Sequence, residues 1–370
     1  MSYKLDIKNM ERNVSCILGL PFDVLNMGGV VDKLHCAVTN KTPCFISTPN
    51  INFLIESLND TDFKNSVINS ELSIVDGAPL VWIARLLRIP IPERVAGSDL
   101  IEALIVNMKK YKPLKVFFFG GENGIAEIAC EKINSETSGL KCVDYLNPGF
   151  GSIEEMSSSE IIDQINQCYA DFVIVSLGAK KGQAWIERNR KDLNAPIISH
   201  LGAVVNFIAG TVNRAPKLLQ KLGLEWLWRI KEEPLLWKRY FKDVRLFFYL
   251  LILRVLPLFI IIRFTEKIRK TTKSSIKVIN NSDVTKIVLT GYWGRDNITE
   301  ITNIFINEIN SLGDIEVVIK NGSYIDDALI AKILLLKNIL SNNNRILIIH
   351  SESKLVARIF RYSCCEYLLQ

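Results

Sequence analysis

The sequence predicts an α/β protein whose main domain is a Rossmann-like, mostly parallel sheet with helices on both faces. Short apolar runs rich in β-branched and aromatic residues alternate with helical patterns from residue 14 to about residue 215, and this alternation is typical of such a sheet. The runs are uninterrupted, as expected for strands that are buried on both faces. With 370 residues, 48% of them hydrophobic, the chain has room for two or three domains.

We expect the strands of this sheet near residues 14–19, 43–48, 72–76, 114–120, 171–177 and 196–200. The sheet domain then covers 1–215, and a basic and apolar helical appendage, broken at Pro234, covers 216–269. A polar linker follows at 270–284. A separate small α/β domain is expected over 285–370, with strands near 285–290, 315–319 and 345–349.

The composition indicates which kinds of partner the protein can bind: a membrane surface is favoured over nucleic acid, and zinc is not expected. The formal net charge is +6, but the basic residues gather between Lys217 and Lys273, where Trp, Phe and Leu are interleaved with them. This mixture favours a membrane surface over nucleic acid. The eight cysteines are scattered without a C-x-x-C pair, and only three histidines are present, so we expect reduced thiols and no zinc site. Residues 1–13 lack the apolar core of a secretory signal.

The apolar run at 246–262 allows three interpretations. It is shorter than the about 20 residues of a transmembrane helix, it carries Arg254 in its middle, and Pro257 interrupts it. Basic residues flank it on both sides, so the charges give no orientation. We favour a segment that lies in the membrane interface or enters one leaflet, with a membrane span and a helix buried against another domain as the alternatives.

Polar or glycine signatures end five of the expected strands. Asp76 follows one apolar run, and the others are followed by the segments Thr48-Pro49-Asn50, Gly120-Gly121-Glu122-Asn123-Gly124, Gly178 and His200-Leu201-Gly202. Ligands of open α/β sheets bind at the carboxyl ends of the strands. These five strand ends are therefore expected to form one assembled site.

Several short motifs, in order, resemble a known family. They are Cys16-Ile17-Leu18-Gly19-Leu20-Pro21-Phe22-Asp23, Thr48-Pro49-Asn50, Asp76-Gly77, Glu93-Arg94-Val95-Ala96-Gly97-Ser98-Asp99-Leu100, Ala209-Gly210, Arg214-Ala215-Pro216 and Gly223-Leu224-Glu225-Trp226-Leu227-Trp228-Arg229. Each motif alone is weak, but together the first 240 residues resemble the WecG/TagA/CpsF glycosyltransferases, family 26 of that class.

The resemblance implies transfer of an N-acetylhexosamine, or its uronate, from a UDP-sugar to a lipid-diphosphate-linked sugar in cell-surface polysaccharide biosynthesis. It also implies that the reaction needs neither metal nor cofactor, and that the protein works at the cytoplasmic face of the membrane as a peripheral or monotopic protein. The alternative is a regulatory adaptor that binds a nucleotide sugar without turnover.

Asp76 is the expected catalytic base, because a carboxylate can take the proton of an attacking acceptor hydroxyl. The alternative for Asp76 is an N-cap of the following helix, which the residues alone favour and the resemblance outweighs. Thr48 and Asn50 are expected to bond sugar hydroxyls; the alternative is ordinary turn chemistry around Pro49.

Arg94 is expected to bind the leaving diphosphate through bidentate contacts, unless it only pairs with Glu93 or Asp99. Gly120 and Gly121 would let the backbone approach a nucleotide, with a helix N-terminus behind them, although the same pattern is common in plain tight turns. Gly178 is a further expected substrate-binding position.

Arg229 and Arg239 lie among Trp226, Trp228 and other aromatic residues. Aromatic rings and cations suit the lipid headgroup zone, and the two arginines are also expected to contact the donor diphosphate. The alternative is a solvated basic helix face.

One motif departs from the family pattern. The family carries G-x-P-K-Q-E-x-W after the fifth strand, whereas this chain has Gly178-Ala179-Lys180-Lys181-Gly182-Gln183-Ala184-Trp185. Aligned on Trp185, the family's Gln falls on Gly182 and its Glu on Gln183. We expect Gln183 to take over the amide role and count it among the catalytic residues.

The last 85 or so residues resemble a STAS domain. The segments Asn321-Gly322-Ser323-Tyr324-Ile325-Asp326-Asp327-Ala328 and His350–Phe360 resemble its phosphosite loop and its later loop and helix. The place of the phosphorylated hydroxyl holds Asp326 and Asp327, which predicts a docking or regulatory module without a phosphorylation switch. A protein partner that binds through this domain is expected.

Overall fold

A computed structural model describes residues 2–106, 111–135, 138–271, 273–281 and 283–370. The chain forms two compact units. The first unit contains residues 1–24, 82–91 and 244–370, and the second contains 25–81 and 92–243. The N-terminal 24 residues thus belong to the same unit as the C-terminal region. These boundaries differ from the domain boundaries that composition suggests.

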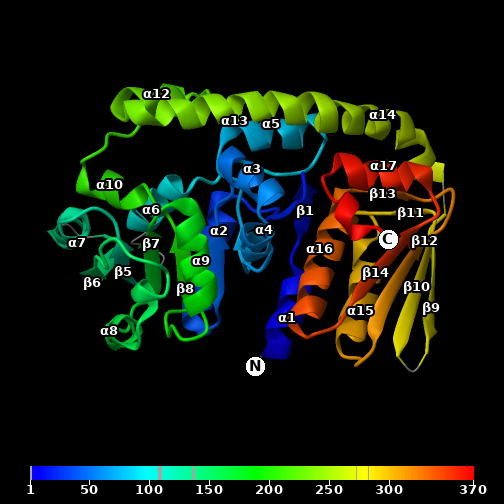
Figure 1. The fold of residues 1–370 in the computed structure, drawn as a ribbon, viewed down its shortest axis with the longest axis horizontal. Helices are drawn as coiled ribbons and strands as arrows, with labels where there is room; N and C mark the ends of the chain where they lie inside the picture. Colours follow the sequence, from blue (N-terminus) through cyan, green and yellow to red (C-terminus); the bar gives the residue numbers. More distant parts are fainter. Residues whose placement is uncertain (1, 107–110, 136–137, 272, 282) are drawn as a thin grey trace. The chain divides into compact units, whose positions relative to one another are not determined.

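The second unit is built on a six-stranded parallel sheet in the order β4-β3-β8-β7-β5-β6 (Figure 1). Its strands are β3 (Cys44–Ser47), β4 (Leu72–Ser73), β5 (Leu114–Gly120), β6 (Leu140–Leu146), β7 (Phe172–Ser176) and β8 (Ile197–His200). Its helices are α2 (Met27–Thr39), α3 (Ile51–Asn59), α4 (Thr61–Ile68), α6 (Gly97–Val106), α7 (Ile125–Ser135), η1 (Glu155–Ser157), α8 (Ser159–Gln167), α9 (Ala179–Asn189) and α10 (Val204–Ala209).

Side chains from successive strand residues enter two cores, one on each face of this sheet. Val116 and Phe118 pack in the core that α2, α6, α7 and α10 cover, whereas Phe117 and Phe119 pack in the core under α8 and α9. Both faces of the strands are therefore buried, which explains the uninterrupted apolar runs. The predicted α/β fold with helices on both faces is confirmed.

Two details of the predicted sheet are wrong. The first predicted strand forms β1 (Val14–Ile17), which pairs with β2 (Leu20–Asp23) in an antiparallel hairpin outside the parallel sheet. The sixth strand of the sheet is instead β6, whose residues show no continuous apolar run. β6 lies at the edge of the sheet, so only part of its surface is buried.

The appendage consists of helices with a break at Pro234, as predicted. Its elements are α11 (Lys217–Lys221), α12 (Glu225–Glu232), η2 (Pro234–Leu236), α13 (Trp237–Leu250), the π-helical turn η3 (Leu251–Val255) and α14 (Leu256–Thr271). Residues 234–265 form one helical stretch of 32 residues that is long and apolar enough to cross a membrane, by length and composition alone. α5 (Ala78–Leu86) and α13 each contain residues of both units.

The first unit contains a four-stranded sheet in the order β14-β12-β10-β9, in which β9 is the antiparallel edge (Figure 1). Its strands are β9 (Ser275–Asn280), β10 (Val284–Thr290), β12 (Asp314–Ile319) and β14 (Leu347–Ser351), with β11 (Tyr292–Trp293) pairing β13 (Tyr324–Ile325). Its helices are α1 (Ser2–Glu11), α15 (Ile298–Ile309), α16 (Asp327–Asn342), α17 (Lys354–Tyr362) and η4 (Glu366–Leu368). β9 occupies part of the range that was expected to be a linker.

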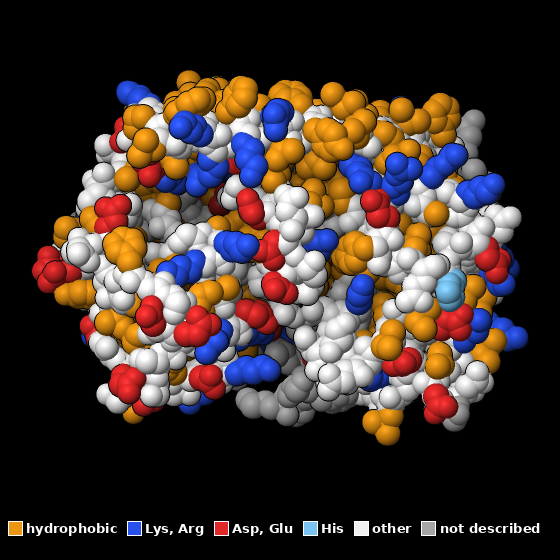
Figure 2. Space-filling view, in the orientation of Figure 1, with side chains coloured by type: hydrophobic (Ala, Val, Ile, Leu, Met, Phe, Trp, Pro, Cys, Tyr) orange, Lys and Arg blue, Asp and Glu red, His pale blue; other side chains and the backbone are white. Residues whose placement is uncertain are grey.

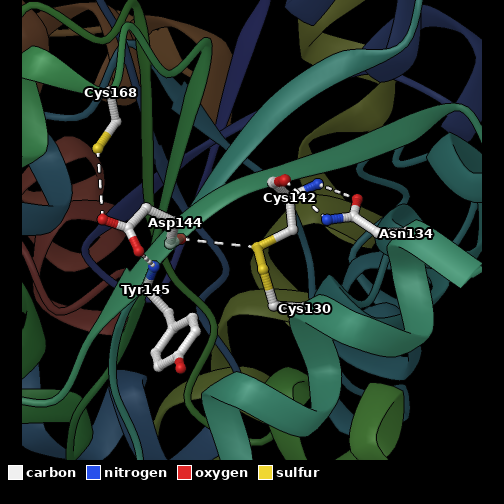
Figure 3. The surroundings of a disulfide bond; sticks show 6 residues. All are labelled: Cys130, Asn134, Cys142, Asp144, Tyr145 and Cys168. Carbon is white, nitrogen blue, oxygen red and sulfur yellow. Dashed lines mark hydrogen bonds between the residues drawn. A yellow bond between two sulfur atoms is a disulfide. The ribbon is translucent and has the colours of Figure 1, made fainter.

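A disulfide joins Cys130 of α7 to Cys142 of β6, so the expectation of reduced thiols is wrong for these two cysteines (Figure 3). Their Cα atoms lie 5.2 Å apart. The Asn134 side chain forms two hydrogen bonds with the backbone of the same strand. It donates to the Cys142 carbonyl and accepts from the Cys142 N–H, both at 3.0 Å. The disulfide therefore ties the helix that follows the Gly120-Gly121 loop to the edge strand.

Candidate active site

The carboxyl ends of β3 and β4 bring three of the predicted residues together. Thr48 and Asn50 follow β3, and Asp76 follows β4, the parallel neighbour of β3. The N–H of Asp76 donates to the Pro49 carbonyl at 3.0 Å, which holds the two loops side by side. The three side chains therefore share one edge of the sheet.

Asn50 has a structural function as well. Its Oδ1 caps α3 by accepting from the N–H groups of Asn52 and Phe53 at 3.0 and 3.1 Å, as Asn commonly does at an N-cap. The carboxamide nitrogen is then the group that Asn50 can offer to a ligand. The capping fixes the orientation of this amide before any ligand arrives.

The carboxylate of Asp76 has a strongly altered acidity. Burial raises its pKa to about 7, against the lowering effect of Arg94, while the negative charges of Glu225 and Asp99 raise it further. The carboxylate accepts from the N–H of Gly97, at the start of α6, and this bond lowers the pKa. An acid that titrates near neutral pH is suited to general base catalysis.

Arg94 lies in an ion-pair network at this edge. Its Nη2 is 2.7 Å from Asp99 and its Nη1 is 3.0 Å from Glu225. Arg214 completes the network, at 2.5 Å from Asp99 and 2.8 Å from Glu102. Of the two ion-pair partners weighed for Arg94, the structure has Asp99. Both terminal nitrogens of the Arg94 guanidinium are paired with carboxylates. The main effect of Arg94 in this structure is therefore electrostatic, since its positive charge lowers the pKa of Asp76.

The carboxyl ends of β5 and β7 lie at the same edge of the sheet, but β8 separates these two strands from β3 and β4. We call the ends of β5 and β7 the other arm of the sheet edge. Gly120 and Gly121 have φ angles of 86° and 95°, which favour glycine. A Cβ on Gly120 would lie 2.9 Å from the Ser176 carbonyl oxygen, so the close approach of the two loops also requires glycine there. Gly178 is the N-cap of α9, and a Cβ built on it meets open space.

Comparison with known proteins shows the family to which this chain belongs. The family model of the Glycosyl transferase WecG/TagA/CpsF family matches residues 15–258, more than half of the chain. The chain belongs to this family. It is a hexosyltransferase of cell-surface polysaccharide biosynthesis.

Several curated relatives carry one name, N-acetylglucosaminyldiphosphoundecaprenol N-acetyl-beta-D-mannosaminyltransferase. The protein from Bacillus subtilis (strain 168) is 26% identical over 224 residues, which is 60% of this chain and 85% of the relative. The protein from Staphylococcus aureus (strain MW2) is 22% identical over 237 residues, which is 63% of this chain and 90% of the relative. In both comparisons, more than a third of this chain lies outside the aligned region.

The glycosyltransferase departs from its family pattern at Gly182, and the structure shows what fills the place. A Cβ on Gly182 would lie 2.2 Å from Cδ2 of His200, so the imidazole occupies the space that a side chain at 182 would need. His200 lies at the end of β8, its Nε2 is 2.6 Å from the Leu177 carbonyl oxygen, and burial lowers its pKa. Gln183 is only 1% exposed and donates from Nε2 to Ser47 Oγ at 3.2 Å. Gln183 thus reaches the residue that precedes Thr48.

Arg229 and Arg239, both predicted to bind the donor, lie in different surroundings. Arg229 on α12 pairs with Glu233 and stacks over the Phe207 ring, with 5.6 Å between guanidinium carbon and ring centroid. The guanidinium of Arg214 lies 5.9 Å from the same ring, which places Arg229 beside the ion-pair network. Arg239 on α13 stacks over its neighbour Tyr240. Among the described residues, no hydrogen bond or ion pair links Arg239 to the network around Asp76.

The prediction from sequence did not select three residues of this site. Asp99, Arg214 and Glu225 surround Asp76 and Arg94 in the fold, but they are far apart along the chain. All three lie in motifs that resemble the family. The charged side chain inside each motif is the feature of the sequence that could have marked them as site residues. His200 was noted only as part of a strand-end signature.

Proposed function

We propose that this enzyme transfers an N-acetylhexosamine or its uronate from a UDP-sugar to a lipid-diphosphate-linked sugar. The names of the relatives support this class of substrates, since they describe N-acetylmannosaminyl transfer to N-acetylglucosaminyldiphosphoundecaprenol. The observation that carries the proposal is the Asp76 carboxylate, held with a pKa of about 7 at the shared edge of β3 and β4.

In the proposed reaction, the acceptor hydroxyl gives its proton to Asp76 while its oxygen attacks the anomeric carbon of the donor, and UDP leaves. Thr48 and the Asn50 amide orient the hydroxyls of the reacting sugars. Arg94 favours the charged, basic form of Asp76 and is held for this purpose by Asp99 and Glu225. The pKa near neutrality keeps a large share of Asp76 ionised and still able to accept a proton.

The donor diphosphate is expected at the other arm of the edge. The N-terminus of α9 begins beside Gly178, where the space above the backbone is open, and helix N-termini bind phosphate through their free N–H groups. The backbone of Gly120-Gly121 lies at the neighbouring strand end. Arg229, beside Arg214, is a cation that can reach the diphosphate as it leaves. Arg239 keeps its predicted role at the lipid headgroups.

The site of action is proposed to be the cytoplasmic face of the membrane, with the protein peripheral or monotopic. Hydrophobic side chains gather along α13 and α14 (Figure 2), and the exposed ones include Phe248, Ile252, Ile260 and Phe264. Apolar side chains flanked by basic residues are typical of interfacial helices. The acceptor lipid is held in the same membrane.

A transfer assay tests the proposal. The purified protein is given a panel of UDP-sugars with a lipid-diphosphate N-acetylglucosamine acceptor, and UDP release and the lipid product are measured. We expect transfer from one class of donor, its loss in Asp76→Asn, and normal transfer in the matched control Asp163→Asn, an exposed acid of α8. Donor binding without turnover in the unmodified protein would contradict the proposal and favour the adaptor function.

A further inference from the structure

The helix at 244–265 has one packed face and one exposed face. The packed face consists of Leu250, Val255, Leu258 and Thr265, each at most 7% exposed. α17 contacts the η3 and α14 parts of this helix, and it lies next to α14 in Figure 1. The exposed face consists of Phe248, Tyr249, Ile252, Leu253, Leu256, Ile260 and Phe264, each at least 40% exposed. α17 and η4 lie beyond residue 258, where the family match ends.

The π turn keeps the packed face continuous. Leu250 and Val255 are five residues apart, and the intervening turn has the N–H of Leu256 bonded to the Leu251 carbonyl. Pro257 follows, and proline has no N–H to give to a carbonyl in the preceding turn. The wider turn therefore carries the helix past Pro257, and the side chains on either side of it, Leu250 and Val255, are both buried.

Arg254, the single charge of the apolar run at 246–262, is bound by the C-terminal elements. Its Nη1 is 2.8 Å from Glu366 Oε2 of η4 and donates to the Arg361 carbonyl at 2.5 Å. That carbonyl lies in the last turn of α17, where a cation is favourable. The charge that would oppose insertion of this helix is thus neutralised on the packed face, away from the exposed apolar side chains.

We propose that α17 and η4 clamp the helix at 244–265 parallel to a lipid surface, with its exposed face in the membrane interface and both chain termini on one side of the membrane. In a membrane span, Arg254 would lie near the middle of the bilayer without Glu366, which is costly. The packed face would also lose its cover.

The occupant of the exposed face is an anionic lipid surface. Residues 244–264 contain no Asp or Glu, and Arg245 and Arg263 are exposed toward the two ends of the apolar stripe. Cations at the border of an apolar stripe are attracted to anionic headgroups. The clamp rests on the proposed function in one respect, that the acceptor of the reaction is a membrane lipid.

The first experiment uses the full-length protein and two variants. Glu366→Ala removes the partner of Arg254, while Glu352→Ala, the matched control, removes an exposed acid that pairs with Lys320 in the same unit. Without vesicles, we expect trypsin to cut within 245–263 about tenfold faster in Glu366→Ala than in the unmodified protein, as loss of ~1.4 kcal/mol of docking would give. The control should be cut at the unmodified rate. Equal cutting of the two variants would overturn the clamp.

The second experiment tests the membrane arrangement. Tags at both termini should be digested alike in inside-out membrane vesicles, and a tag that is protected at one end only would show a span. The unmodified protein should bind vesicles of phosphatidylcholine with phosphatidylglycerol more tightly than phosphatidylcholine alone, and failure to bind either would overturn the proposal. Transfer to a soluble acceptor analogue should be unchanged in Glu366→Ala. Absence of this transfer in the unmodified protein would contradict the proposed function. It would not affect the test of the clamp, because proteolysis and vesicle binding are measured without transfer.

Discussion

Replacing Glu225 by Gln should shift the pH dependence of transfer to lower pH. Glu225 raises the pKa of Asp76, and it also engages Arg94, which lowers that pKa. Removing the Glu225 charge eliminates a repulsion and leaves Arg94 less neutralised, so both changes favour the ionised form of Asp76. The acid limb of kcat/KM should then move below its position near pH 7.

The size of the effect follows from the pKa of about 7. With this value, about 9% of Asp76 is ionised at pH 6 and about 91% at pH 8. A shift of about one unit, or ~1.4 kcal/mol, would raise the ionised share at pH 6 to about 50%. The rate at pH 6, relative to the plateau, should therefore rise about fivefold in Glu225→Gln.

The assay is the pH profile of kcat/KM for UDP release, normalised to the plateau of each variant. The matched control is Glu102→Gln, because Glu102 pairs with Arg214 in the same network but is not among the groups with the largest effects on the pKa of Asp76. Its profile should stay in place. Asp76→Asn should lower turnover about 10²–10⁴-fold. An unshifted or alkaline-shifted limb in Glu225→Gln would refute the electrostatic reasoning, and near-normal turnover in Asp76→Asn would refute the base itself.

Protein stability reports the same pKa independently. The pKa of Asp76 is raised on folding from 3.8 to about 7, so the folded state binds the proton more tightly than the unfolded state. Stability is then lost as pH rises from about 4 to about 7, by up to ~4 kcal/mol. Asp76→Asn should raise the free energy of unfolding at pH 8 and leave it nearly unchanged at pH 3. A destabilised variant at pH 8 would mean that Asp76 serves a structural role such as capping.

Three further predictions concern α9 and the chain ends. Gln183→Ala should lower transfer more than Lys181→Ala, because Gln183 contacts Ser47 beside the site. Lys181 instead donates to the Gly151 carbonyl. Equal, small losses would mean that this part of α9 has no role in the reaction. Gly182→Gln should lower the melting temperature by collision with His200, and adding His200→Ala should restore it, whereas an additive loss would contradict the steric reasoning. Truncation at residue 280 should make the protein aggregate and open residues 14–24 to proteolysis, because α16 no longer covers the β1–β2 hairpin.

The central strands were predictable because burial on both faces leaves a clear pattern. β5 and β7 are continuous apolar runs, but β6, with the sequence LKCVDYL, mixes polar and apolar residues as an edge strand can. Because β6 was missed, the partnership of Cys130 and Cys142 could not be inferred either. The hairpin of β1 and β2 did carry a signal. Its two-residue turn, Leu18-Gly19, has φ angles of 47° and 90°, the positive values typical of a tight hairpin turn.

The individual strand-end residues of the site were predictable, but their electrical environment was not. Asp76 stands out because a lone acid follows an apolar run, and its sheet edge follows from the fold class. Its pKa depends on Glu225, which lies in the appendage, and on Asp99 of α6. No local pattern brings these carboxylates together, since the packing of α12 decides their proximity to Arg94.

The predicted separable C-terminal module conflicts with the contacts of α16. Lys332 of α16 is 3% exposed and donates to the carbonyls of Met10 and Arg12, and Arg12 forms a buried ion pair with Asp23. The hairpin also buries four apolar side chains that are at most 2% exposed, Ile17, Leu18, Leu20 and Phe22. Burial of each contributes ~1.5–3 kcal/mol, so about 6–12 kcal/mol would be lost with the C-terminal region, as much as the whole stability of an ordinary domain, ~5–15 kcal/mol. A protein cut at residue 280 that stayed soluble and resisted proteolysis within 14–24 would show that the hairpin has another place to pack, and the C-terminal region would then be separable after all.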